Sequence, residues 1–359
     1  MSIAKMMNFS LLQGHFLCYT KRDILYDVLN RKKLVSGING GEMKKILIAT
    51  DFTETERQQV EVIAAGHQVI YKSNLEVTPA DMKEVNIVMG NLSLRHFADV
   101  PDLEWIQLQT AGTDGYLKPG VLPAGVLLTN VTGAFGESIA EYVIGAALAL
   151  KNHFHTYFYH QTIKHWQKIP VSNLKGSTVV ILGLGDIGRE TAKRMKAMGA
   201  YVVAVKRRKS EKPEYVDELH YEADLDMVLP RADVFVLTIP MYEAVHHIID
   251  RTRIGLLKES AILINVARGK LIDQPALIEA LEQNKIAGAA LDVFEQEPLP
   301  AENPLWEMKN IILTPHNSGG FSSPMARRKI GEIMIGNLER YLKGELPINI
   351  IDKETGYCL

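Results

Sequence analysis

Short apolar runs alternate with amphipathic stretches along most of this chain, beginning at Met43. Apolar runs rich in β-branched residues and bounded by turns are typical of buried strands. Stretches whose apolar residues recur every three or four positions are typical of helices that bury one face. We therefore expect strands at residues 46–49, 69–71, 87–89, 106–108, 178–182, 201–205, 234–238, 261–265, 287–291 and 311–313, and helices at 53–65, 137–150, 189–198, 276–283 and 322–342.

The order of these elements predicts the fold class. Strands and helices alternate along the chain, which is typical of α/β domains with parallel sheets. A chain of 359 residues is too long for one ordinary domain and long enough for two that each bury a core. We expect two doubly wound parallel-sheet domains.

A glycine-rich loop stands halfway along the chain, directly after an expected strand and directly before an expected helix. Gly183, Gly185 and Gly188 have the spacing G-x-G-x-x-G. This placement lets backbone N–H groups and a helix N-terminus face a pyrophosphate, so it predicts a dinucleotide site that includes Asp186 and Ile187. A strand-to-helix turn without a ligand can have the same glycines, so the neighbouring residues decide between the two.

Four cations follow the second strand of this βαβ unit: Lys206, Arg207, Arg208 and Lys209. An NAD site normally has an acid here, which accepts hydrogen bonds from the adenosine ribose and repels a 2′-phosphate. Guanidinium groups instead pair well with phosphate oxygens. The sequence therefore favours NADPH, and NAD stays possible. A solvated basic turn is the alternative, because runs of like charge usually face solvent.

Three side chains with catalytic potential stand at or just after the ends of later expected strands. Hydride addition to a carbonyl builds negative charge on its oxygen, and a protonated His316 could donate a proton as the alkoxide forms. Glu297 could pair with the other ring nitrogen and favour the charged imidazole. Arg268 could bind the carboxylate of a 2-oxo acid and polarise its carbonyl. Each could instead be a structural residue, but their order beside a nucleotide motif favours a catalytic set.

Four motifs in combination make the chain resemble the D-2-hydroxyacid dehydrogenases, the family that includes glyoxylate and hydroxypyruvate reductases and phosphoglycerate dehydrogenase. They are GLGDIG at 183–188, NVARG at 265–269, DVFEQEP at 292–298 and TPHNSGG at 314–320. The resemblance covers nearly everything from Met43 onward. It implies that Arg268, Glu297 and His316 are the catalytic residues, and that the enzyme is a homodimer.

The resemblance implies further site residues. The loop of Thr110, Ala111 and Gly112 would bind the substrate carboxylate through backbone N–H groups, and Asp292 would lie near the nicotinamide carboxamide. Other cofactor contacts would come from Ile239, Pro240, Val266, Ala267 and Ser318.

Two segments depart from the family pattern. Met241 and Tyr242 follow Pro240, where the family usually has leucine and threonine, so the local contacts to the cofactor ribose could differ. Asn317 and Ser318 follow the histidine, where isoleucine and glycine are more frequent, which could change the wall of the substrate pocket.

The position of the glycine-rich loop also predicts the domain organisation. A Rossmann-type cofactor domain at 146–317 would be inserted into a flavodoxin-like substrate domain made of 43–145 and 318–349, followed by a tail at 350–359. The chain would then cross between the domains twice, forming a hinge beside a ligand cleft whose closure excludes water. Residues 1–42 show no export signal, and we expect the native start at Met43 because Gly-Gly-Glu before it is what a translated ribosome-binding site would spell.

Composition argues against several other classes of protein. The 40 basic and 42 acidic residues give a net charge of −2, so no overall field favours nucleic acid or an anionic membrane. No apolar run is long enough to span a bilayer. The two cysteines, Cys18 and Cys358, lie outside every motif, which argues against a disulfide framework and favours the reducing cytoplasm.

A cluster of histidines at 153, 155, 160 and 165 is the one metal-like feature. Its spacings do not stack on one helical face as metal ligands would, so we expect no metal. These histidines, with the aromatic residues Phe154, Tyr157, Phe158 and Trp166 between them, are expected at a helix surface or a dimer surface.

The sequence predicts an oxidoreductase that transfers a hydride between NAD(P)H, with NADPH preferred, and a small 2-oxo acid such as glyoxylate or hydroxypyruvate. One alternative is a non-catalytic NAD(P)-sensing protein like the corepressors that resemble this family. The other is phosphoglycerate dehydrogenase, although residues 105–109 offer no cation for a phosphorylated substrate.

Overall fold

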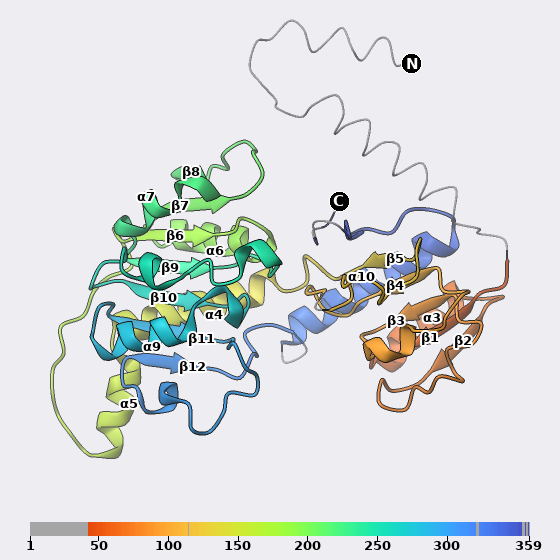
Figure 1. Ribbon diagram of the computed structural model, residues 1–359, viewed down its shortest axis with the longest axis horizontal. Helices are drawn as coiled ribbons and strands as arrows, with labels where there is room; N and C mark the ends of the chain where they lie inside the picture. Colours follow the sequence, from red (N-terminus) through yellow and green to blue (C-terminus); the bar gives the residue numbers. More distant parts are fainter. Residues whose placement is uncertain (1–41, 114, 321–322, 354–355, 357, 359) are drawn as a thin grey trace, which may run out of the picture.

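The computed structural model describes residues 42–113, 115–320, 323–353, 356 and 358. These residues form two parallel-sheet α/β units, which confirms the predicted fold class (Figure 1). Every pairing between the strands of either sheet is parallel. Cys18 and almost all of the expected N-terminal extension lie outside the described residues, so the expected start at Met43 stays a prediction.

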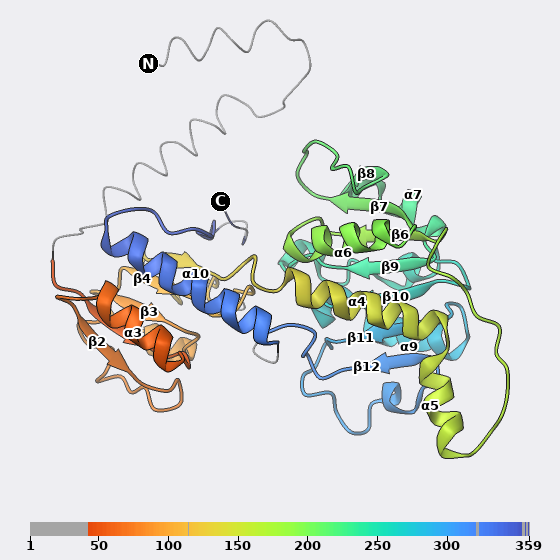
Figure 2. The same ribbon diagram turned by 180° about the vertical axis from the view of Figure 1, so that it is seen from behind.

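The first unit has five strands in the order β2-β1-β3-β4-β5. Strand β1 is buried on both faces, because Ile46 and Ile48 join one apolar cluster while Leu47 joins another. Helices α3 and α10 cover the first of these faces (Figure 2). The elements are β1 (Lys45–Ile48), α3 (Glu54–Ile63), β2 (Gln68–Tyr71), β3 (Ile87–Met89), η1 (Leu94–Phe97), β4 (Trp105–Gln107), β5 (Leu127–Thr129) and α10 (Pro324–Leu342).

The second unit has seven strands in the order β12-β11-β10-β9-β6-β7-β8. Helices α4 and α6 pack on one face and α7, α8 and α9 on the other. The strands are β6 (Thr178–Leu182), β7 (Tyr201–Lys206), β8 (Glu218–Tyr221), β9 (Val234–Leu237), β10 (Ile262–Asn265), β11 (Gly288–Leu291) and β12 (Ile311–Leu313). The helices are α4 (Gly136–Lys151), α5 (Phe154–Thr162), α6 (Asp186–Ala197), α7 (Leu225–Val228), α8 (Arg251–Ile254) and α9 (Gln274–Glu282), with short 3-10 turns η2 (Glu222–Asp224), η3 (Leu229–Arg231), η4 (Glu243–Val245), η5 (Gly269–Leu271) and η6 (Pro304–Glu307).

Two helices connect the units. Helix α4 leaves the five-stranded sheet and packs against α6, β10, β11 and β12, while α10 comes back from β12 and packs against α3. The last helix therefore returns to the first unit, as the sequence predicts. The boundary expected between residues 145 and 146 falls inside α4, and the limits of the two domains stay a prediction.

The Asp186 carboxylate stabilises the first connection between the units, the segment that leads into α4. Its Oδ2 accepts hydrogen bonds from the N–H groups of Gly133, at 3.2 Å, and Gly136, at 2.9 Å. Helix α4 needs this acceptor because its own N-cap residue, Phe135, forms no side-chain cap. Gly136 makes room for it, since a Cβ there would lie 2.3 Å from Asp186 Oδ1. The contact joins the segment that leads into α4 to the first residue of α6.

A buried amide stabilises α10, the helix of the second connection. Asn337 of α10 is fully buried, and its Nδ2 donates to Gln107 Oε1 at 2.7 Å and to the Ile348 carbonyl at 3.0 Å. Its Oδ1 accepts from the Ile348 N–H at 2.7 Å. Gln107 Oε1 also accepts from Thr129 Oγ1, whose oxygen accepts from Trp105 Nε1. The network ties α10 to β4 and β5.

We expect Asn337→Ala to lower the free energy of unfolding by about 3 kcal/mol, because it removes a donor from the buried Gln107 Oε1 and both hydrogen bonds to the backbone of Ile348. Chemical denaturation followed by circular dichroism measures the change. Glu332→Ala, on an exposed position of the same helix, is the control and should change stability by less than about 0.5 kcal/mol. Equal stability of the two variants would contradict a structural role for this amide.

Candidate active site

The glycine-rich loop joins β6 to α6 in the arrangement that a dinucleotide needs. Gly183 has φ +106°, and a Cβ on Gly188 would lie 2.0 Å from the Gly183 carbonyl oxygen, so packing requires both glycines. Gly185 differs, because a Cβ there would meet nothing within 4 Å among the described residues. Gly185 is also the N-cap of α6 and forms no side-chain cap. The loop therefore leaves space and backbone donors where a pyrophosphate would bind.

The side chain of Asp186 lies elsewhere. Because its carboxylate accepts hydrogen bonds from the linker before α4, this residue offers a dinucleotide its backbone N–H rather than its side chain. Further along the same edge, Ile239 and Pro240 follow β9, and Val266 and Ala267 follow β10. The structure thus places the expected cofactor residues on one sheet edge, while their roles stay predictions.

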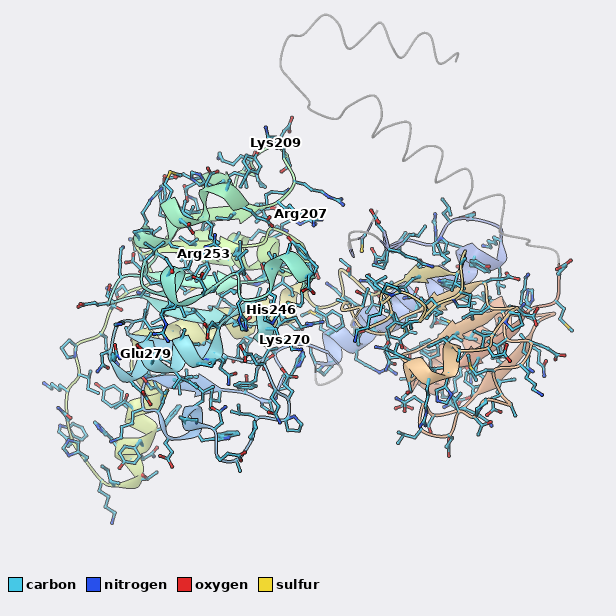
Figure 3. The ribbon with its side chains drawn as sticks, viewed as in Figure 1. Arg207, Lys209, His246, Arg253, Lys270 and Glu279 are labelled. Atoms are coloured by element: carbon cyan, nitrogen blue, oxygen red, sulfur yellow. The ribbon has the colours of Figure 1, made fainter. Side chains whose placement is uncertain are left out.

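The basic residues after β7 gather with a cation that the sequence analysis missed. Burial lowers the pKa of Lys206, and the nearby charges of Arg189 and Arg208 lower it further. Lys206 Nζ donates to Ser210 Oγ at 2.9 Å. Arg189 comes from the first turn of α6, so only the packing of α6 beside β7 reveals it. Figure 3 labels Arg207 and Lys209 on the turn that follows this strand.

The structure brings Glu297 and His316 together. His316 Nδ1 lies 2.7 Å from Glu297 Oε2, while Glu297 Oε1 accepts the Phe294 N–H at 2.9 Å. The carboxylate therefore holds the imidazole by one nitrogen and leaves Nε2 to face a ligand. The His316 side chain is 50% exposed, so a ligand can reach it.

A buried carboxylate shapes the loop that presents His316. Asp292 is 1% exposed and accepts hydrogen bonds from Thr314 Oγ1 at 2.6 Å, the Asn317 N–H at 2.9 Å, the Ser318 N–H at 3.0 Å and Ser318 Oγ at 2.5 Å. Its carbonyl accepts the His316 N–H at 2.8 Å. These bonds hold His316 at φ +50°, a left-handed conformation that is unusual for a residue other than glycine. Asp292 thus organises the loop.

Helix α4 also contacts this loop. The Tyr142 hydroxyl lies 2.7 Å from Thr314 Oγ1, and burial raises the pKa of Tyr142 to about 12. Tyr142 is therefore neutral near pH 7 and connects α4 to the hydrogen bonds around Asp292.

Arg268 lies at the carboxyl end of β10, the neighbour of the strand that precedes Asp292. Asn265 shapes its turn, since Nδ2 donates to the Arg268 carbonyl at 2.9 Å and Oδ1 accepts the Ala267 N–H at 3.0 Å. Gly269 allows this turn to pack on the next one, because a Cβ there would lie 1.8 Å from the Phe294 carbonyl carbon. The segments that carry Arg268 and Glu297 are therefore in direct contact.

The expected substrate loop lies at the carboxyl end of β4, on the five-stranded sheet. Thr110 Oγ1 donates to the Gly112 carbonyl at 2.9 Å and accepts from Asn91 Nδ2 at 2.9 Å. Asn130 Nδ2 donates to the Ala111 carbonyl at 2.6 Å. Neither asparagine was among the site residues expected from the sequence. Their one signal was position, because Asn91 closely follows β3 and Asn130 follows β5 at the same sheet edge.

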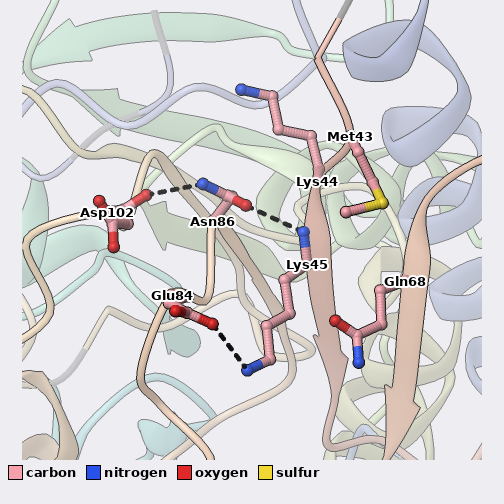
Figure 4. A pocket seen from close by; sticks show the side chains of 7 residues that line it. All are labelled: Met43, Lys44, Lys45, Gln68, Glu84, Asn86 and Asp102. Carbon is pink, nitrogen blue, oxygen red and sulfur yellow. Dashed lines mark hydrogen bonds and ion pairs between the residues drawn. The ribbon is translucent and has the colours of Figure 1, made fainter.

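A small cavity opens at the opposite edge of the five-stranded sheet (Figure 4). Its volume is about 230 Å³, and residues that begin or precede strands line it, among them Lys45 and Asn86. Asn86 Oδ1 accepts the Lys45 N–H, and Asn86 Nδ2 donates to the Asp102 carbonyl. These polar groups bind one another at the amino edge of the sheet, whereas ligands of such sheets bind at the carboxyl edge.

Three further features concern metal binding, membrane spanning and the cysteine near the C-terminus. In the part of the chain that the structure describes, no cluster of three or more His, Cys, Asp or Glu residues is arranged to hold a metal. The described helices include none that is both long and apolar enough to cross a bilayer. Cys358 is partly buried beside Thr132, and burial raises the pKa of its thiol.

Known proteins are similar to this chain in sequence and in fold. The family model for the NAD binding domain of D-isomer specific 2-hydroxyacid dehydrogenases matches residues 144–318. A glyoxylate reductase from Thermofilum pendens is 33% identical over 261 residues, which are 71% of this chain and 76% of that protein.

Two solved structures are also similar. A D-isomer specific 2-hydroxyacid dehydrogenase family protein from Aeromonas salmonicida has a TM-score of 0.76 at 32% identity, over 87% of this chain and all of that one. An NADPH-dependent glyoxylate/hydroxypyruvate reductase from Sinorhizobium meliloti, in complex with NADP and sulfate, has a TM-score of 0.75 at 25% identity, over 88% of this chain and all of that one.

The chain belongs to the D-isomer specific 2-hydroxyacid dehydrogenase family. It is an oxidoreductase that acts on CH–OH donors and uses NAD(P), and its relatives act on small 2-oxo or 2-hydroxy acids. The predicted family and enzyme class are therefore confirmed.

Proposed function

We propose that this enzyme reduces a small 2-oxo acid, such as glyoxylate or hydroxypyruvate, with NADPH as the preferred donor. The 2.7 Å contact between His316 Nδ1 and Glu297 Oε2 is the main support, because it pairs a proton donor with a carboxylate beside the Arg268 turn. The names of the glyoxylate reductase relatives support the substrate class.

Each residue has a defined task in this proposal. Bound NADPH supplies the hydride. Arg268 binds the substrate carboxylate through its fork of N–H groups and polarises the neighbouring carbonyl. The N–H groups of the loop from Thr110 to Gly112 bind the same carboxylate from the other sheet. His316 donates a proton from Nε2 to the carbonyl oxygen as negative charge develops there, while Glu297 stabilises the charged ring.

We expect His316→Asn to lower kcat/KM for glyoxylate reduction by about 10²- to 10⁴-fold, the usual contribution of a general acid. Glu297→Gln should lower it less, because the amide still occupies the position beside Nδ1 but no longer carries the negative charge that stabilises the charged ring. Steady-state kinetics measures both effects.

His220→Asn is the matched control for this prediction. His220 Nε2 lies 2.9 Å from Glu218 Oε2, so the variant removes another histidine–carboxylate pair of the same unit, away from the turns that carry Arg268 and His316. It should leave kcat/KM unchanged. Full activity of His316→Asn would refute the proposed proton donor.

The cations at the end of β7 support the preference for NADPH. Arg189 and Arg208 are both close enough to Lys206 for their charges to lower its pKa. A 2′-phosphate bound among them would relieve this repulsion and form charge-assisted hydrogen bonds. The ribose hydroxyls of NADH lack that charge and gain much less from the cluster.

We therefore expect kcat/KM to be at least about tenfold higher with NADPH than with NADH, since one tenfold step corresponds to a single charge-assisted contact of ordinary strength. Arg208→Gln should reduce the NADPH value and leave the NADH value nearly unchanged. Assays with both donors and with 2-oxo acids of increasing size measure the donor preference and define the substrate. A preference for NADH would exclude this cofactor assignment.

We also propose that the enzyme is a homodimer through α5 and the residues after it. Phe158 is 66% exposed and Trp166 is 94% exposed, and large apolar side chains gathered at one surface favour a protein partner. Phe154 and Phe158 lie one helical turn apart, with ring centroids separated by 6.5 Å and ring planes tilted by 42°.

Sedimentation analysis should give a mass near twice 40.1 kDa. Phe158→Glu combined with Trp166→Glu should shift the protein to the monomer, because charges would replace the apolar contact. Lys168→Glu, a change of charge at an exposed residue of the same segment, is the control and should leave the mass unchanged. A wild-type monomer would contradict the proposal.

A further inference from the structure

Three separate segments meet at Tyr242. The guanidinium carbon of Arg207, at the end of β7, lies 5.2 Å from the centre of the Tyr242 ring. The Tyr242 hydroxyl donates to Glu222 Oε1, at the end of β8, at 3.2 Å. Tyr242 itself stands on the loop after β9. The ring is therefore held from two sides by residues that follow neighbouring strands.

The strand order explains why this contact spans the nucleotide side of the sheet. β6 lies between β9 and β7, so the loop that carries Tyr242 must pass over the end of β6 to reach Arg207. Lys206 pairs with Tyr221 in the register of β7 and β8, so Arg207 and Glu222 are the next residues beyond that pair. A doubly wound sheet binds its dinucleotide at the point where the connections diverge, here between β6 and β9. Tyr242 thus borders the adenosine half of that site.

Stacking on an aromatic ring prepares an arginine for phosphate. The contact uses the flat face of the guanidinium, whereas a phosphate is bound by N–H groups at its edge, so both can occur together. A side chain already held in one orientation loses less conformational entropy when the ligand binds. Arg207 directly follows Lys206, whose charge interacts with those of Arg189 and Arg208.

We propose that Tyr242 is a positioning residue for cofactor selection: it holds Arg207 in the orientation that binds the 2′-phosphate of NADP, and Glu222 holds Tyr242. This inference rests on the proposed use of NADPH. The family usually has threonine at this position, which has no aromatic ring. The contact between Arg207 and Tyr242 therefore depends on a residue at which this chain differs from the family pattern. Selectivity for the 2′-phosphate then depends on an aromatic residue that does not itself carry the charge.

Equilibrium binding to the full chain tests the proposal without turnover. Isothermal titration calorimetry gives the Kd of NADP⁺ and NAD⁺, and of the fragments 2′,5′-ADP and 5′-AMP, which differ by the 2′-phosphate. We expect Tyr242→Leu to raise the Kd of NADP⁺ and 2′,5′-ADP by about tenfold. The Kd of NAD⁺ and 5′-AMP should change by less than about twofold. Tyr242→Phe keeps the stacking surface and should stay within about threefold of the wild type for all four.

Two further variants complete the experiment. Tyr71→Leu removes another arginine–tyrosine contact, with Arg57 at 5.0 Å in the five-stranded unit, and should change none of the four affinities. If Tyr242→Leu does not fold, as judged by circular dichroism, Tyr242→Thr replaces it. Equal losses for the phosphorylated and unphosphorylated ligands would show a merely structural role, and no loss at all would also overturn the inference.

Binding of the two fragments to the wild-type protein distinguishes the role of Tyr242 from the preference for NADPH. Tight binding of 2′,5′-ADP that Tyr242→Leu does not weaken would refute the role of Tyr242 and leave the NADPH preference intact. Equal binding of 2′,5′-ADP and 5′-AMP by the wild type would refute the NADPH preference, and the inference about Tyr242 would be refuted with it.

Discussion

Parallel pairing is the constraint on which the rest of this structure depends. Because every strand in each sheet runs in the same direction, the loops after the strands meet at one edge. Arg268, Glu297 and His316 are separated along the sequence, yet they follow β10, β11 and β12, which are neighbours in the sheet. The same rule places the glycine-rich loop, the basic turn and Tyr242 along the rest of that edge. An antiparallel sheet would distribute these residues over both edges.

Two aspartates turn this edge into a defined site. Asp292 fixes the loop of His316, and Asp186 fixes the linker between the sheets; both do so by accepting main-chain N–H groups. Buried or partly buried donors without partners cost free energy, so a carboxylate that accepts several of them selects one loop conformation strongly. Both residues lie in family motifs, and in this structure their side chains serve architecture. The neighbouring His316, by contrast, is half exposed and accessible to a ligand.

Elements with strong local patterns were predictable, and those without them were not. The strand at β6 and the helix at α4 were expected nearly where they lie, because each has a clear apolar period. β5 is only a short run, and β8 is an edge strand with polar residues in every other place, so both were missed. Asn91, Asn130 and Arg189 were missed for another reason. Nothing in their own neighbourhood is unusual, and they matter through contacts that the fold creates.

The sequence by itself determined the fold class, the dinucleotide loop and the three side chains with catalytic potential, because these depend on periodicity and on short motifs. The tertiary structure decided which groups meet. It paired Glu297 with His316, turned the Asp186 carboxylate toward α4, and placed Tyr242 over Arg207. Such contacts depend on strand order and on the paths of loops that cross several strands, and residues near in the sequence do not specify either one.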